Sequence, residues 1–159
     1  MSNSNLFCSI RLMEVMAQAE KRIAAFYETC AQQFPVSRNF WEDLAAEENG
    51  HAEIIDEVMR AAIEEPEMFD AGESSPLEAL QTFMSRLESG FEMLTKDRLT
   101  ERDALFMAYL IENTFAEHSY ARAIKSKDPY YVRNLDKLTL DSAGHRTRVI
   151  QRMKEQRSI

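Results

Sequence analysis

Apolar residues recur at every third or fourth position along most of the chain, the spacing that gathers side chains on one face of an α-helix. This pattern predicts four long helices, at about residues 9–33, 37–64, 100–125 and 131–156. Pro35 ends the first of them, and Asp128 and Pro129 separate the last two. Runs of β-branched residues bounded by turns are missing from the sequence, so the pattern predicts an all-α protein.

The connection between the second and third long helices is itself structured. Residues 65–75 contain Pro66 and Gly72 and predict a loop. A shorter helix is predicted after Ser75, because Ser75, Pro76 and Glu78 supply an N-cap serine, a proline at N1 and an acid at N3. An up-down pair, a long crossover and a second up-down pair is the connectivity of a ferritin-like four-helix bundle. The chain length fits a single domain over residues 1–159.

Charge and cysteine content narrow the function classes. The formal net charge of −8 argues against nucleic-acid binding through a broad basic surface. No apolar run approaches the length of a membrane span, and residues 1–5 lack a signal-peptide pattern. Cys8 and Cys30 form no Cys-x-x-Cys motif, and on one helix they would lie roughly 33 Å apart at about 1.5 Å per residue. Free thiols and a cytoplasmic location are therefore expected.

Several polar residues occupy positions where the helical pattern demands apolar ones. They are Glu20, Glu48, His51, Glu112 and His145. Burying carboxylates costs a great deal of free energy unless they are paired, protonated or bound to cations. A metal cluster explains all five residues together, because carboxylate oxygens and imidazole nitrogens suit iron, manganese or zinc. The alternatives are a buried glutamate paired with a base or tyrosine, a packed polar His145, and an exposed Glu48–His51 pair.

The order of these residues repeats along the chain. A glutamate on one helix, Glu20 or Glu112, is followed by a histidine on the next, His51 or His145, and His51 belongs to a Glu-x-x-His motif. Two glutamates and two Glu-x-x-His motifs that face inward are the arrangement of di-iron carboxylate bundles. Glu20 precedes His51 by 31 residues, and Glu112 precedes His145 by 33 residues. The chain is therefore predicted to consist of two weakly similar halves, each supplying half of a metal site.

The first half resembles the rubrerythrin type of ferritin-like protein. That family pairs a Glu-x5-Phe-Tyr helix with a Leu-Ala-x-Glu-Glu-x-x-His-Ala helix, and this chain has Glu20…Phe26-Tyr27 followed by Leu44…Glu48-x-x-His51-Ala52. The resemblance implies a non-haem di-iron site that reacts with peroxide or oxygen, as a peroxidase or ferroxidase, and it implies a homodimer. Tyr27 lies two turns after Glu20 on the same helix face, so its phenol is expected to orient a liganding carboxylate from outside the metal shell, the alternative being an ordinary core tyrosine. Longer members of the family carry a C-terminal rubredoxin domain that delivers electrons. This chain lacks the cysteines for such a domain, so an external electron donor would be required.

The second half departs from the family pattern at two places. It has His118 and Ser119 in place of the Phe-Tyr pair after Glu112, and it differs before His145. Ser142 stands three residues before His145, where the family has a glutamate ligand. Asp141 is one residue out of register, so its side chain is expected to point about 100° away and to reach the site only if the helix is distorted. His118, near Glu112 in sequence, is expected at the helix surface or outside the metal shell. Carry-over from the family thus leaves three carboxylates and two histidines.

Three functions follow from this set of residues. The first is a rubrerythrin-like protein that binds two iron ions, or one if the Ser142 position disables the second site, with manganese or zinc as further candidates. The second is a ferritin-like scaffold or interaction protein whose site holds one metal or none. The third, an oxygenase acting on an organic substrate, ranks last because no sequence feature marks a substrate pocket.

Overall fold

The computed structural model describes the backbone of residues 2–72, 77–96, 99–117 and 120–156, and within this part the protein is mostly helical. Its helices are α1 (Ser2–Gln33), α2 (Arg38–Glu64), α3 (Leu77–Thr95), α4 (Glu101–Glu117), α5 (Tyr120–Ala123) and α6 (Pro129–Gln156). Single 3-10 turns, Pro35–Ser37 and Pro66–Met68, follow α1 and α2. The predicted predominance of helix is confirmed, and the breaks at Pro35 and at Asp128–Pro129 lie where the sequence indicates them.

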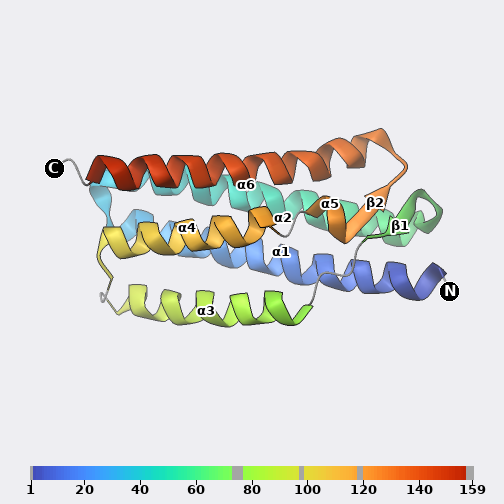
Figure 1. Ribbon diagram of the computed structural model, residues 1–159, viewed down its shortest axis with the longest axis horizontal. Coiled ribbons are helices and arrows are strands. Elements are labelled where there is room, and N and C mark those ends of the chain that lie inside the picture. Colours follow the sequence, from blue (N-terminus) through green and yellow to red (C-terminus); the bar gives the residue numbers. More distant parts are fainter. Residues whose placement is uncertain (1, 73–76, 97–98, 118–119, 157–159) are drawn as a thin grey trace.

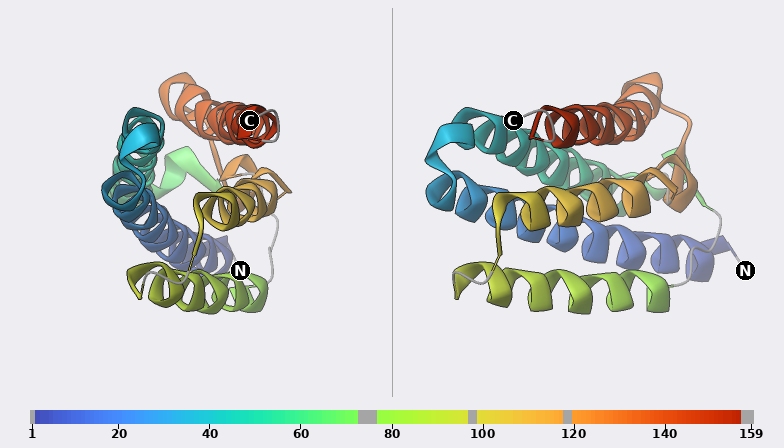
Figure 2. Two further views of the ribbon diagram at one scale, coloured as in Figure 1. Left: turned by 90° about the vertical axis from the view of Figure 1, so that its left-hand side faces the viewer. Right: turned by 60° about the vertical axis from the view of Figure 1, so that its left-hand side comes forward.

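The long helices run side by side along one axis (Figure 1). Helices α1 and α2 form one antiparallel pair, α4 and α6 form a second, and α2 lies beside α6 while α1 contacts α4. Seen end-on, these four helices surround a common interior, and α3 lies outside them against α1 and α4 (Figure 2). Because α3 carries the chain back along the length of the molecule, α4 starts at the same end as α2.

The structure also contains a short β-ribbon that the pattern did not predict. Strand β1 (Phe69–Ala71) pairs antiparallel with β2 (Ile124–Ser126), and Asp70 lies opposite Lys125. The predicted helix to residue 125 is therefore wrong at its C-terminal end, and the predicted loop is partly strand. A three-residue strand is too short to show an alternating pattern, and its hydrogen bonds come from a partner more than fifty residues away.

Two helices differ in extent from the prediction. Helix α1 begins seven residues earlier, and its first turns pack against the ribbon, where the backbone N–H of Gly72 donates a 3.1 Å hydrogen bond to Oγ of Ser9. Helix α3 has 19 residues against 17 in α4, so it is not a minor bridging element. The capping residues Ser75 and Pro76 predicted for α3 lie outside the described residues.

The core is built from apolar side chains of all five long helices. Its largest fully buried members include Met13, Phe26, Tyr27, Trp41, Ile55, Leu94, Leu105 and Leu138. Cys8 and Cys30 both lie on α1 as free thiols. Within the part of the chain that the structure describes, no helix is long and apolar enough to cross a membrane.

Candidate metal site

The five polar residues expected on apolar faces all lie in the interior between α1, α2, α4 and α6. Glu20 comes from α1, Glu48 and His51 from α2, Glu112 from α4 and His145 from α6, and each exposes 2% or less of its surface. Helical periodicity explains this placement, because each residue shares its helix face with core residues three or four positions away. The fold thus brings carboxylates and imidazoles from four helices into one buried cluster.

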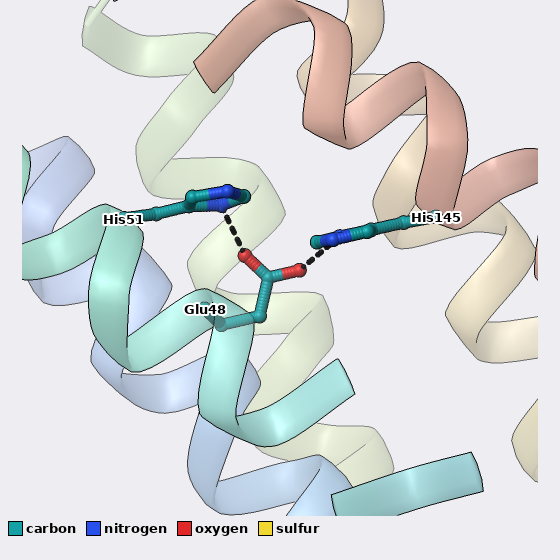
Figure 3. A group of neighbouring side chains, drawn as sticks. All are labelled: Glu48, His51 and His145. Atoms are coloured by element: carbon teal, nitrogen blue, oxygen red, sulfur yellow. Dashed lines mark hydrogen bonds and ion pairs between the residues drawn. The ribbon is translucent and has the colours of Figure 1, made fainter. Parts of the chain in front are cut away.

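Glu48 lies at the centre of this cluster (Figure 3). Its Oε1 lies 2.8 Å from Nδ1 of His145, and its Oε2 lies 2.9 Å from Nδ1 of His51. The two imidazole rings are stacked, with centroids 5.3 Å apart and planes inclined by 16°. One ligand atom from each of these three residues falls within 4.8 Å of the others, so the group is compact enough to hold a metal ion.

Glu20 on α1 and Glu112 on α4 complete the cluster. The side chain of Glu20 is hydrogen-bonded to Glu48. Glu112 places Oε2 3.5 Å from Nδ1 of His145, and its Oε1 accepts a 2.6 Å hydrogen bond from the hydroxyl of Tyr27. Tyr27 therefore restrains one oxygen of Glu112 while the other faces the histidine.

The cluster shows the electrostatic strain expected of buried acids. Burial raises the pKa of Glu20 well above its usual value, and the charge of Glu48 adds to this effect. Burial and the charge of Glu48 likewise raise the pKa of Glu112 to about 7. Burial also acts to raise the pKa of Glu48, but hydrogen bonds with His145 and His51 outweigh it and lower that pKa below the usual carboxylate range. Glu48 is therefore the carboxylate of the cluster that is most readily ionised, and its negative charge raises the pKa values of Glu20 and Glu112.

His145 supplies the compensating positive charge. Its burial acts to lower the pKa, but hydrogen bonds with Glu112 and Glu48 outweigh this and raise the pKa to about 10. Among the described residues, no lysine or arginine forms an ion pair with Glu20, Glu48 or Glu112. The protonated forms of Glu20 and His145 thus offset part of the negative charge that the three carboxylates would carry.

Asp141 lies nearer to the cluster than its register suggests. Its Oδ2 lies 3.2 Å from Nε2 of His51, on the ring edge opposite Glu48, and it pairs with Lys137. Helix α6 is continuous through this position, so Asp141 makes this contact from a regular helix. The acid approaches the outer nitrogen of a histidine on the facing helix, and that contact requires no change of register.

Glu47 is the neighbour of the cluster that the sequence pattern missed. Its Oε2 lies 2.7 Å from Nε2 of His145 and 2.8 Å from Nη2 of Arg148. The available signal was its spacing, since Glu47 precedes His51 by four residues as Asp141 precedes His145.

Ser142 contributes no ligand atom to the cluster. Its side chain is buried, and its hydroxyl donates a 3.0 Å hydrogen bond to the carbonyl oxygen of Leu138 in its own helix. The hydrogen-bonding capacity of this position is therefore directed to the backbone. His118 lies outside the described residues.

Comparison with models of known protein families, with curated proteins and with solved structures finds no match to this chain. The local chemistry therefore carries the functional argument. The buried Glu48, His51 and His145 are donors of the kinds that transition metals prefer, and the four surrounding helices shield them from water.

Proposed function

We propose that the protein is a ferritin-like, rubrerythrin-type protein that binds redox-active metal, most suitably iron, between α1, α2, α4 and α6. The observation that carries this proposal is the position of Glu48 between Nδ1 of His51 and Nδ1 of His145. A carboxylate with one oxygen directed to each histidine has the arrangement of a bridging ligand. The antiparallel pairs α1–α2 and α4–α6, with α3 in the crossover, support the ferritin-like part of the proposal.

The donor set fits such a metal. His51 and His145 would each bind one ion, Glu48 would bridge the two, and Glu20 and Glu112 would bind from the other side. Three carboxylates and two neutral imidazoles carry a charge of −3, which partly neutralises two divalent ions in an interior that otherwise disfavours charge. Manganese and zinc fit the same donors.

Bound iron would supply the electrons for reaction with peroxide or oxygen, the activity that the family resemblance implies. The residues of the chain have simpler tasks. Glu48 holds negative charge between the two imidazoles, Tyr27 orients Glu112, and the surrounding apolar side chains exclude water. An external electron donor and a homodimer belong to the same proposal.

Ser142 favours a second candidate, a ferritin-like scaffold or interaction protein that holds one metal or none. The hydroxyl of Ser142 is bonded to the backbone, so His145 is the one buried residue of α6 that offers a metal ligand atom. The ion pairs of His145 with Glu48 and Glu112 would balance part of the charge of a metal-free cluster.

Metal stoichiometry separates the two candidates. The protein is produced with ferrous iron and its metal content per chain is measured by mass spectrometry, beside Glu48→Gln and the exposed control Glu53→Gln on the same helix. The di-iron proposal expects close to two ions per chain in the wild type and in Glu53→Gln, and a large loss in Glu48→Gln. A wild-type value near zero, unchanged by Glu48→Gln, would contradict metal binding and favour the scaffold.

Peroxide reactivity tests the redox part separately. Ferrous protein is mixed with peroxide, and the loss of chelatable ferrous iron is followed in time. Oxidation that is faster than for free ferrous iron, and that slows to the free rate in Glu48→Gln, is the expected result. Stoichiometric metal with no accelerated oxidation would restrict the protein to metal binding.

A further inference from the structure

Helices α2 and α6 carry the same acid–histidine pair at the same spacing. Glu47 precedes His51 by four residues, and Asp141 precedes His145 by four residues. In the structure each acid contacts the histidine of the facing helix and not its own. Glu47 meets Nε2 of His145 at 2.7 Å, and Asp141 meets Nε2 of His51 at 3.2 Å. The two contacts are therefore reciprocal and crossed.

We propose, building on the metal site proposed above, that Glu47 and Asp141 are a crossed pair of positioning residues. Each holds the outer nitrogen, Nε2, of the histidine on the facing helix and so directs the inner nitrogen, Nδ1, to the metal at Glu48. The geometry follows from hydrogen-bonding chemistry. An ionised carboxylate only accepts hydrogen bonds, so Glu47 and Asp141 keep a proton on the Nε2 atom that each one faces. A metal that displaces the proton between Nδ1 and Glu48 then meets the lone pair of Nδ1, while Nε2–H still holds the ring in place.

The surroundings of the two acids agree with this role. Both lie further out than the cluster, with 42% of the Glu47 side chain and 28% of the Asp141 side chain exposed. Each also has a basic partner from α6, Arg148 for Glu47 and Lys137 for Asp141. Each carboxylate is thus held between the outer nitrogen of a histidine and a basic side chain.

The crossed pair also changes the interpretation of α6. Asp141 corresponds to Glu47 and not to Glu48, because both acids lie four residues before a histidine. Helix α6 therefore keeps its outer acid and lacks only the inner one, at Ser142. The second half of the site has lost one ligand position while keeping the histidine and the residue that orients it.

The test uses zinc as a diamagnetic probe and reads each histidine separately. Zinc affinity is measured by competition with a chelator, and the state of each ring nitrogen by long-range proton–nitrogen NMR on labelled protein. The variants are Asp141→Ala and Glu47→Ala, Asp141→Asn as the version that keeps an oxygen acceptor, and Asp136→Ala as an exposed control on α6.

In the wild type we expect Nδ1 of both histidines bound to zinc and both Nε2 atoms protonated. Asp141→Ala should weaken zinc binding about 10–100-fold, the usual effect of losing a carboxylate behind a histidine ligand, and should change the signals of His51 alone. Glu47→Ala should change those of His145 alone, and Asp141→Asn should recover most of the affinity. General loosening of the fold would move both histidines together, and that result, or equal zinc binding and unchanged His51 signals in Asp141→Ala and Asp136→Ala, would overturn the proposal.

Failure of the metal site is distinguishable from failure of the crossed pair. If the wild type binds neither zinc nor ferrous iron, the proposed function fails. The crossed pair is then judged in metal-free protein, where the slowly exchanging Nε2–H signal of His51 should be lost in Asp141→Ala and kept in Asp136→Ala. Persistence of that signal in Asp141→Ala would overturn the positioning role.

Discussion

The hydroxyl of Tyr27 donates a 2.6 Å hydrogen bond to Oε1 of Glu112, which lies 85 residues further along the chain. Both side chains are buried, so the bond connects α1 to α4 inside the protein. It leaves Oε2 of Glu112 facing His145. The contact supports the expectation that Tyr27 orients a carboxylate of the site, and it sets a first prediction.

Replacing Tyr27 with phenylalanine should weaken both stability and metal binding. The buried Glu112 loses its donor, which should lower the free energy of unfolding by about 1–3 kcal/mol. The hydrogen bond from Tyr27 also lowers the pKa of Glu112, so its removal should raise that pKa further above about 7 and shift metal binding to higher pH. Zinc titrations between pH 6 and pH 8 measure the shift, with Tyr109→Phe on α4 as the control. Identical pH profiles for the two variants would contradict the role of Tyr27.

The stability of the metal-free protein should fall as pH rises from about 7 to about 10. Folding raises the pKa of His145 from 6.5 to about 10, so the folded state binds more protons than the unfolded state over this range. The pKa of Glu112, raised from 4.5 to about 7, acts in the same direction at lower pH, between these two values. The stabilisation is complete below the unfolded pKa values and is lost as these protons leave. Glu48 has the opposite sign, since its lowered pKa stabilises the protein above the usual carboxylate range and this is lost in acid.

Metal should reverse this trend, because metal and protons compete for the same ligand atoms. The increase in melting temperature on adding zinc should therefore be larger at pH 8.5 than at pH 6. Thermal unfolding with and without zinc at both pH values measures it. An increase independent of pH would show that zinc does not replace the protons of Glu112 and His145.

Ser142→Glu should increase metal occupancy and lower the stability of the metal-free protein. A glutamate three residues before His145 restores an inner carboxylate on α6, but without metal it adds a fourth acid to a buried site. Ser142→Gln is the matched control, with similar size and no charge. Metal per chain, with melting temperatures in the presence and absence of iron, decides between them. Equal occupancy in the two variants would mean that the missing carboxylate does not limit the site.

Two glycines should respond oppositely to alanine. A Cβ at Gly72 would overlap the backbone carbonyl oxygens of Arg122 and Ala123 beside the β-ribbon, whereas a Cβ at Gly50 in α2 meets no atom within 4 Å. Gly72→Ala should thus destabilise the protein by about 1–3 kcal/mol through overpacking. Gly50→Ala should stabilise it by roughly 0.5–1 kcal/mol through helix propensity. Denaturant unfolding measures both changes, and comparable stability in the two variants would contradict the close approach at Gly72.

The positions of the long helices and the identity of their buried faces could be predicted from the sequence alone. The helical spacing of apolar residues determined where the long helices lie and which face of each is buried, because both depend on side chains three and four residues apart. The same spacing showed that Glu20, Glu48, His51, Glu112 and His145 point inward. Polar residues on an apolar face are a local signal, and no knowledge of the partner helices was needed to detect them.

The contacts between helices were decided only by the tertiary structure. The β-ribbon depends on hydrogen bonds between segments more than fifty residues apart. The pairing of Asp141 with His51 and of Glu47 with His145 depends on how far α2 and α6 are rotated about their axes. Periodicity states which face of a helix is buried, but not which atom of another helix meets it. For that reason Asp141 seemed out of register within α6, yet it meets the outer nitrogen of His51 across the gap between the two helices.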